Sequence, residues 1–181
     1  MDIVIAGFAG LSGTKLLLEN EKTKTELEKR FPKRYLLEAE RQAGVSDGWE
    51  TPAIARRALY GLHFKEVPCG LGGIKKALWD LGAALDTGLS IDLEEVPIRQ
   101  ETIEIAEYFN LNPYRIQSNH MYIYATDQAT TLVRELDRAG IPASIAGYTT
   151  LDNDRVIYFD HGREKRFLEP VKRDELDRIL K

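Results

Sequence analysis

The chain is poor in the residues that build disulfide and metal frameworks. It has one cysteine, Cys69, which excludes an internal disulfide and favours a reducing, cytoplasmic location. Its three histidines, His63, His120 and His161, are widely separated and not spaced with the cysteine as zinc ligands would be. The sequence therefore predicts no structural metal site.

Two further absences concern partners. The 25 Lys and Arg residues are outnumbered by 29 Asp and Glu, for a net charge of −4, so we expect no nucleic-acid partner. No apolar run reaches the roughly 18 residues that a membrane span needs. The apolar start, residues 1–10, carries Asp2 and no basic residue, which is typical of a strand and not of a signal peptide. We expect no membrane association.

What is present is the composition and patterning of one soluble domain. The 181 residues are 43% hydrophobic and 30% charged. Alternation and helical periodicity, with Gly and Pro at the boundaries, predict a single layered α/β (α+β) domain with a mixed β-sheet packed with helices. Asp152 to Asp154 have the composition of a hairpin turn. Strands are expected at 2–7, 89–98, 120–126, 141–150 and 154–160, with a strand or loop at 63–73. Helices are expected at 14–31, 33–43, 52–62, 73–85, 99–111, 127–140 and, charged and amphipathic, 171–181.

Two glycine-rich turns each precede a predicted helix. Exposed backbone amides and the positive end of a helix can together bind a phosphate. In the first turn, Ser12, Gly13 and Thr14 would contact the anion, or they simply form a tight turn with a helix cap. In the second, the binding groups would be Gly70, Gly72 and Gly73, or the glycines only allow close packing of the helix.

A polar tip joins the helix near residue 109 to the strand near residue 122. It reads "QSNHM", and such connections often present groups to a ligand. Asn119 is a candidate substrate contact, and His120 is a candidate general base or phosphate donor near neutral pH. The alternative is a solvated tip with no binding role.

Three stretches in this order resemble the C-terminal domain of the aminoimidazole ribonucleotide (AIR) synthetase superfamily. The match is closest to its hydrogenase expression and maturation branch and extends over nearly the whole chain. The stretches are "GFAGLSGTKLLL" (7–18), "CGLGGIKKALWDLGAALDTGLSIDLEEVPIRQETIEIAEYFNLNPY" (69–114) and "SNHMYIYATDQATTLVRELDRAGIPASIAGYTT" (118–150).

The resemblance implies a division of labour between two domains. Complete enzymes of the superfamily are dimers that use ATP and Mg²⁺ to activate an amide or similar oxygen by phosphorylation. An N-terminal domain carries most nucleotide contacts, and residues 1–181 match only the C-terminal domain. We therefore expect the N-terminal ATP-binding domain to lie outside this chain, in the same or a separate polypeptide, with a homodimer as the assembly.

This sequence departs from the branch pattern at several polar positions. Where the branch has Asp-Pro-Thr-Arg before its Gly-Gly pair, this chain has residues 68–71, Pro-Cys-Gly-Leu. Where the branch tip has Asn-Glu-Gly, this chain has Asn119-His120-Met121, and its last residues, "DRILK", contain no cysteine. Two functions follow as hypotheses. One is a domain that contributes anion- or substrate-binding loops to a shared ATP-dependent cleft, and the alternative is a divergent, non-catalytic module that binds a metabolite or a protein.

Overall fold

The computed structural model describes residues 1–44 and 48–180 and contains a seven-stranded mixed sheet within them. The strand order is β2-β4-β1-β5-β3-β6-β7; β3 and β6 are parallel, and the other neighbours are antiparallel. The predicted layered α/β domain with a mixed sheet is confirmed. The strands are β1 Asp2–Ala6, β2 Phe64–Pro68, β3 Gly88–Asp92, β4 Tyr122–Thr126, β5 Ala143–Thr150, β6 Arg155–Phe159 and β7 Glu164–Phe167.

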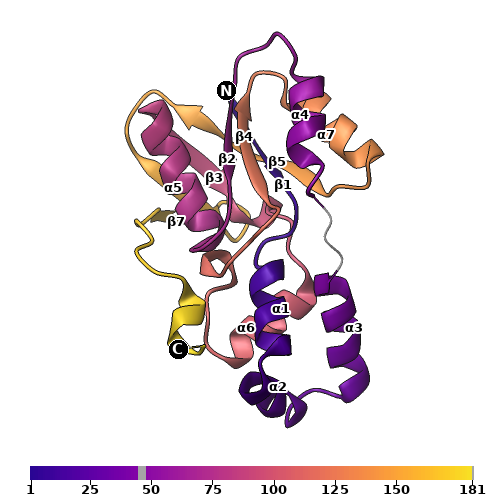
Figure 1. Ribbon diagram of the computed structural model, residues 1–181. Coiled ribbons are helices and arrows are strands. Elements are labelled where there is room, and N and C mark those ends of the chain that lie inside the picture. The colour runs from indigo at the N-terminus through magenta and orange to yellow at the C-terminus, as the bar shows by residue number, and fades with distance from the viewer. Residues whose placement is uncertain (45–47, 181) are drawn as a thin grey trace.

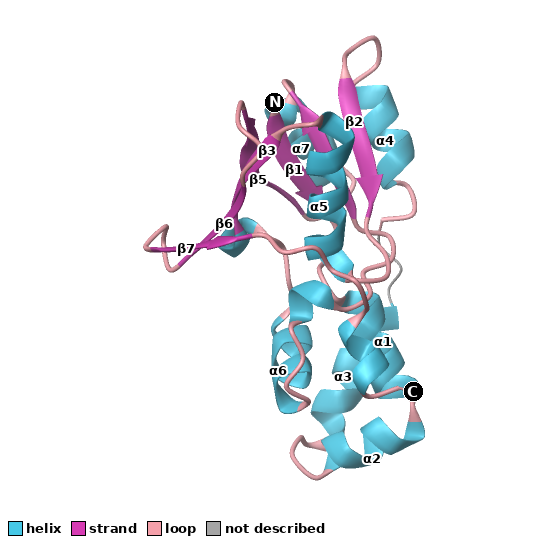
Figure 2. Ribbon diagram, turned by 90° about the vertical axis from the view of Figure 1, so that its left-hand side faces the viewer, coloured by secondary structure: helices cyan, strands magenta, loops and turns pink. Residues whose placement is uncertain are grey.

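Helices cover both faces of this sheet and form a bundle at one end of it. Figures 1 and 2 both place α1, α2, α3 and α6 in that bundle, near the last residues of the chain. The helices are α1 Leu11–Glu19, α2 Glu21–Glu28, α3 Lys33–Gly44, α4 Thr51–Ala58, α5 Gly73–Leu85, α6 Gln100–Tyr108 and α7 Ala129–Arg138. Short 3-10 turns occur at η1 Leu93–Glu95, η2 Pro113–Arg115 and η3 Glu175–Arg178.

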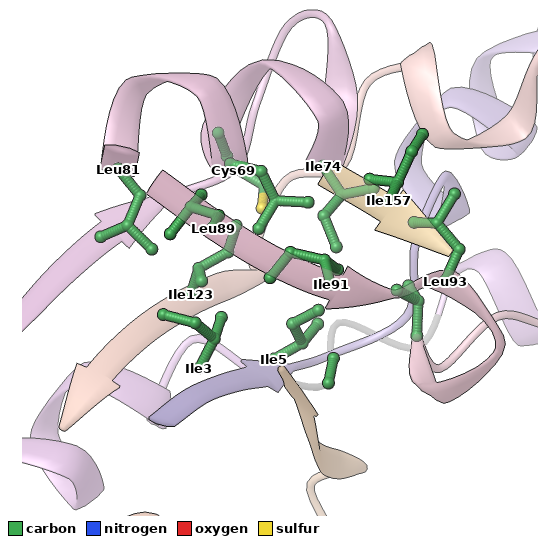
Figure 3. Packing of buried hydrophobic residues seen from close by; sticks show 14 of the residues in the cluster. Ile3, Ile5, Cys69, Ile74, Leu81, Leu89, Ile91, Leu93, Ile123 and Ile157 are labelled. Carbon is green, nitrogen blue, oxygen red and sulfur yellow. The ribbon is translucent and has the colours of Figure 1, made fainter. Parts of the chain in front are cut away.

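The alternation of side chains along β1 explains why both faces are covered. Ile3 and Ile5 are fully buried in the cluster that packs against α5, which also holds Cys69 (Figure 3). Val4 and Ala6 are fully buried in a second cluster, with residues of α4 and α7. Successive residues of a strand point to opposite faces, so a strand apolar at every position needs a helix layer on each side. A third apolar cluster holds the helical bundle together.

The hairpin predicted between the fifth and sixth strands is wrong. Strand β3 lies between β5 and β6 and pairs with both, so the connection at 151–154 passes over the start of β3. Backbone bonds hold it there: Leu89 N donates to Asp154 O at 2.9 Å, and Gly88 N donates to Asp152 O. The true hairpin joins β6 to β7, a strand that the sequence did not predict.

Two predicted helices are also corrected. The helix expected over 14–31 begins at Leu11 and breaks at Asn20, whose extended backbone (φ −76°, ψ 122°) separates α1 from α2. The Asn20 side chain accepts hydrogen bonds from Lys22 N and Thr23 N, so it caps the second helix. The predicted helix at 171–181 is only the short turn η3, because Asp174 binds the amides of Leu176 and Gly72 and fixes the segment.

No helix among the described residues combines the length and apolarity that a membrane span requires.

The cap at Asn20 gives a first testable prediction. Replacing Asn20 with Ala removes the acceptor for two amides at the start of α2 and should lower the free energy of unfolding by about 1 kcal/mol. Urea denaturation followed by circular dichroism measures the change. The control is Asn153→Ala in the exposed turn between β5 and β6, which should change it by less than about 0.5 kcal/mol. Equal effects of the two substitutions would contradict the capping role.

Candidate functional site

The two glycine-rich turns lie on either side of the segment that links η2 to β4. The residue that bridges them is Ser118, which is fully buried. Its Oγ accepts a hydrogen bond from Gly10 N at 2.8 Å and donates one to Ile116 O at 3.0 Å. Its backbone N donates to Gly70 O at 3.1 Å. The polar tip of the sequence therefore contains a residue, Ser118, that ties both turns together.

The first turn uses its polar groups within the protein. Ser12, Gly13 and Thr14 lie in the first turn of α1, not in a loop, because Gly10 adopts the left-handed conformation (φ 69°) and precedes the helix. Gly13 N donates to Gln117 O at 2.9 Å. The Thr14 hydroxyl is buried and donates to Gly10 O at 2.9 Å. Gly13 and Thr14 thus support the bridging segment, and an anion-binding role for them stays a prediction.

The second turn is already occupied by a carboxylate. Gly72 N, at the start of α5, donates to Asp174 Oδ2 at 2.7 Å, and Gly73 N donates to Gly70 O at 3.0 Å. Burial raises the pKa of Asp174 above its ordinary value, although the hydrogen bonds from Gly72 and Leu176 oppose that shift. An external anion at this helix end would have to displace the Asp174 side chain. Anion binding by Gly70, Gly72 and Gly73 therefore also stays a prediction.

A cavity of about 310 Å³ lies between α1, the end of α3 and the polar tip. Three of the candidate residues, Ser12, Asn119 and His120, line it together with Lys15. Ser12 Oγ donates to Gln117 O at 2.9 Å and accepts from Asn119 N at 2.8 Å, which fixes the tip against the helix. The structure thus brings the first turn and the tip into one site, whose lining includes no residue of the second turn.

His120 has a constrained backbone and a free side chain. Its φ of 62° is in the left-handed region. The His120 carbonyl oxygen lies close to two glycines. A Cβ added at Gly7 would be 3.1 Å from this oxygen, and a Cβ added at Gly48 would be 2.5 Å from it. The exposed imidazole makes no hydrogen bond to any residue that the structure describes. The imidazole is available to a ligand, while the backbone that carries it is held in place.

Lys15 is the functional group that sequence reasoning missed. It lies three residues after Ser12, a spacing that places both on one face of α1, and this periodicity was the available signal. Lys15 Nζ is 3.8 Å from Glu19 Oε1, and the two side chains are 44% and 50% exposed. Such an exposed pair contributes little stability, so it leaves the ammonium group able to contact a phosphate.

Because the Ser118 hydroxyl bridges the two segments, we expect its removal to lower the stability of the protein clearly. Ser118→Ala leaves the buried Gly10 amide without an acceptor and should lower the free energy of unfolding by about 1–3 kcal/mol. The measurement is urea denaturation. Ser90→Ala is the matched control, because that hydroxyl lies on a partly exposed strand face and has no hydrogen-bond partner among the described residues. A Ser118 variant as stable as the Ser90 variant would rule out the bridge.

Substitutions at two glycines distinguish the cost of close packing from the cost of backbone strain. Gly73 (φ 61°) and Gly61 (φ 75°) share the left-handed conformation, but only a Cβ at Gly73 would meet another atom, Ile116 O at 2.5 Å. Gly61→Ala should cost about 1 kcal/mol for the conformation alone. Gly73→Ala should cost clearly more, because the bridging segment must also move. Equal thermal stabilities of the two variants would contradict the close approach.

No family model and no curated protein matches the chain by sequence. Solved structures do match its fold. Escherichia coli HypE, a hydrogenase maturation protein, is 18% identical with a TM-score of 0.71, over 98% of this chain and 51% of HypE. A HypE solved in complex with ATP is 14% identical, with a TM-score of 0.63, over 93% of this chain and 50% of that one. Thiamine-monophosphate kinase from Stenotrophomonas maltophilia is 15% identical, with a TM-score of 0.58, over 83% of this chain and 47% of the kinase.

These matches confirm the structural part of the resemblance seen in the sequence. HypE and thiamine-monophosphate kinase are both of the AIR synthetase-like type. The chain spans about half the length of each. It therefore has the fold of one half of these larger proteins.

Proposed function

We propose that this chain is one half of an ATP-using protein and contributes a polar cavity to a cleft that a nucleotide-binding domain completes. The observation that carries the proposal is the convergence of Ser12, Asn119 and His120, from distant parts of the sequence, on one cavity with Lys15. The half-length matches to HypE and thiamine-monophosphate kinase support it, as does the HypE structure solved with ATP. If the assembly is catalytic, the chemistry would be ATP-dependent activation of an amide oxygen.

Each residue of the cavity would have a distinct task. Lys15 supplies a positive charge for a phosphate group, and the Asn119 amide supplies neutral hydrogen bonds to a substrate. The exposed His120 imidazole can contact a phosphate group or the substrate by a hydrogen bond. The hydroxyl of Ser12 orients the tip through its hydrogen bonds with Gln117 O and Asn119 N.

The cavity fits a phosphate group better than it fits Mg²⁺. Among the described residues, Glu19 is the carboxylate that lines it, and Glu19 is paired with Lys15. One engaged carboxylate does not make a magnesium site, since Mg²⁺ prefers several oxygen ligands in octahedral geometry. In this proposal the metal ion and most nucleotide contacts therefore belong to the partner domain.

The partner is a nucleotide-binding domain of the same or a separate polypeptide, and self-association of the chain is part of the same proposal. Ile145 and Tyr148, 40% and 55% exposed on β5, support a surface that another protein covers.

One observation favours the alternative of a non-catalytic module. Both glycine turns already use backbone amides within the chain, through Gln117, Ser118 and Asp174. A protein that has lost phosphate binding at these turns would retain the fold as a metabolite- or protein-binding unit.

Two measurements on the isolated chain test the proposal. We expect no ATP turnover with Mg²⁺, because in this proposal a separate domain carries most of the nucleotide contacts. Inorganic triphosphate, the anionic part of the nucleotide, should shift the ¹H–¹⁵N signals of Ser12, Lys15 and His120. Lys15→Met should weaken this binding about tenfold or more, since a charge-assisted contact contributes about 1.5–3 kcal/mol. The control is Lys22→Met, an exposed lysine of α2 outside the cavity.

ATP turnover by the chain alone would refute the idea of half a site. Unchanged triphosphate binding by the Lys15 variant would remove the cavity from the proposal and favour the non-catalytic alternative.

A further inference from the structure

A second polar cavity, of about 410 Å³, lies between α5, the β6–β7 hairpin and the segment after β7. Lys75, Arg115 and Arg166 line it, from three elements that are far apart in the sequence. Glu169 is the carboxylate in its lining. It shares no residue with the cavity at Ser12. Among the described residues that line this cavity, cations thus outnumber carboxylates three to one.

Lys75 is held in an environment that is unfavourable for a cation. It is the third residue of α5, near the positive end of the helix dipole. Its ammonium group makes no hydrogen bond or ion pair with any residue in 1–44 or 48–180. Burial lowers the pKa of Lys75, and Arg115 and Arg166 lower it further, against weaker contributions from Glu169 and Glu175. An anion next to Lys75 would stabilise its charged ammonium group against these effects.

The two arginines have donors left over. Arg115 Nε is buried and donates no hydrogen bond to any described residue. It lies 3.5 Å from Glu175 Oε1, with which it forms an ion pair. Glu175 is shared, because its Oε2 accepts a 2.8 Å hydrogen bond from Arg178. Arg166 contacts Glu164 of its own strand at 3.4 Å, with the Arg166 side chain 71% exposed, and such a pair is weak.

We propose that this cavity binds a phosphorylated small molecule, with the phosphate group between Lys75, Arg115 and Arg166. A phosphate monoester carries about 1.5 to 2 negative charges at neutral pH, which matches three cations better than a single carboxylate does. The planar guanidinium donors of arginine suit its oxygens. Ile157, Phe167 and Val171 supply an apolar wall for the rest of the ligand.

The experiment compares the intact chain with two variants, using pyrophosphate and inorganic phosphate as probes. Sodium chloride keeps the ionic strength constant, because screening alone changes exposed charge interactions. In the wild type, pyrophosphate at about 100 times its Kd should raise Tm by about 5 °C or more. Lys75→Met and Arg166→Gln should each raise the Kd about tenfold or more. The controls are Lys33→Met and Arg134→Gln, exposed residues outside this cavity, which should bind as the wild type does.

A second readout distinguishes a binding lysine from a structural one. Without any anion, Lys75→Met should be as stable as the wild type or more stable, because it removes an unfavourably placed charge while keeping a long side chain in the helix. A loss of stability in this variant without anion would mean that Lys75 supports the fold through Glu169 or Glu175, and would overturn the proposal. So would the absence of a Tm shift in the wild type, or equal shifts in wild type and both variants. None of these substitutions touches Ser12, Lys15 or His120, so a loss of binding in these variants reports on this cavity and not on the cavity at Ser12.

Discussion

The end of the sheet that borders both cavities depends on one buried residue, Ser118. The Ser118 hydroxyl accepts a hydrogen bond from the amide of Gly10 in the first glycine turn, and the Ser118 amide donates one to the carbonyl of Gly70 in the second. A buried amide without an acceptor costs about 1–3 kcal/mol, so the chain gains by filling each turn with its own polar groups. The glycines are needed here for close approach, as at Gly73, where a Cβ would nearly touch Ile116 O. In the structure these turns therefore use their amides to support the segment that lies between them.

Because the amides of the glycine turns already have partners within the chain, the polar groups that remain available lie on side chains at the surface around these turns. On one side, the tip places Asn119 and His120 beside α1, where Lys15 lines the same cavity. On the other side, the start of α5 carries Lys75 toward the arginines of η2 and β7. Both cavities thus border a glycine-started helix, but the contacts they offer to a ligand come from side chains. Side chains at such edges can change without disturbing the packing beneath them, which suits a fold that HypE and thiamine-monophosphate kinase share.

The segment after β7 connects the two halves of the molecule. Asp174 binds the start of α5, and Leu176 is buried in the cluster of the helical bundle. Glu175, between them, pairs with Arg115 and Arg178. These contacts hold the bundle to the sheet beside the cationic cavity.

Local pattern alone was enough for much of this fold. The continuous apolar run of β1 required two helix layers, and the spacing of Ile74, Ala77, Leu78 and Leu81 identified the buried face of α5. The residues of the tip and of the first turn were identifiable as candidates because polar groups at element ends have few packing roles. The tertiary structure decided the strand pairing, because β3 lies between β5 and β6. The composition of the turn after β5 predicts a chain reversal, but it does not show whether another strand lies between the two strands that the turn joins. The same holds for Ser118 and Asp174. The glycines that they bind, Gly10, Gly70 and Gly72, are more than 40 residues away along the chain, and only the packed fold determines which amides must be satisfied and by which side chains.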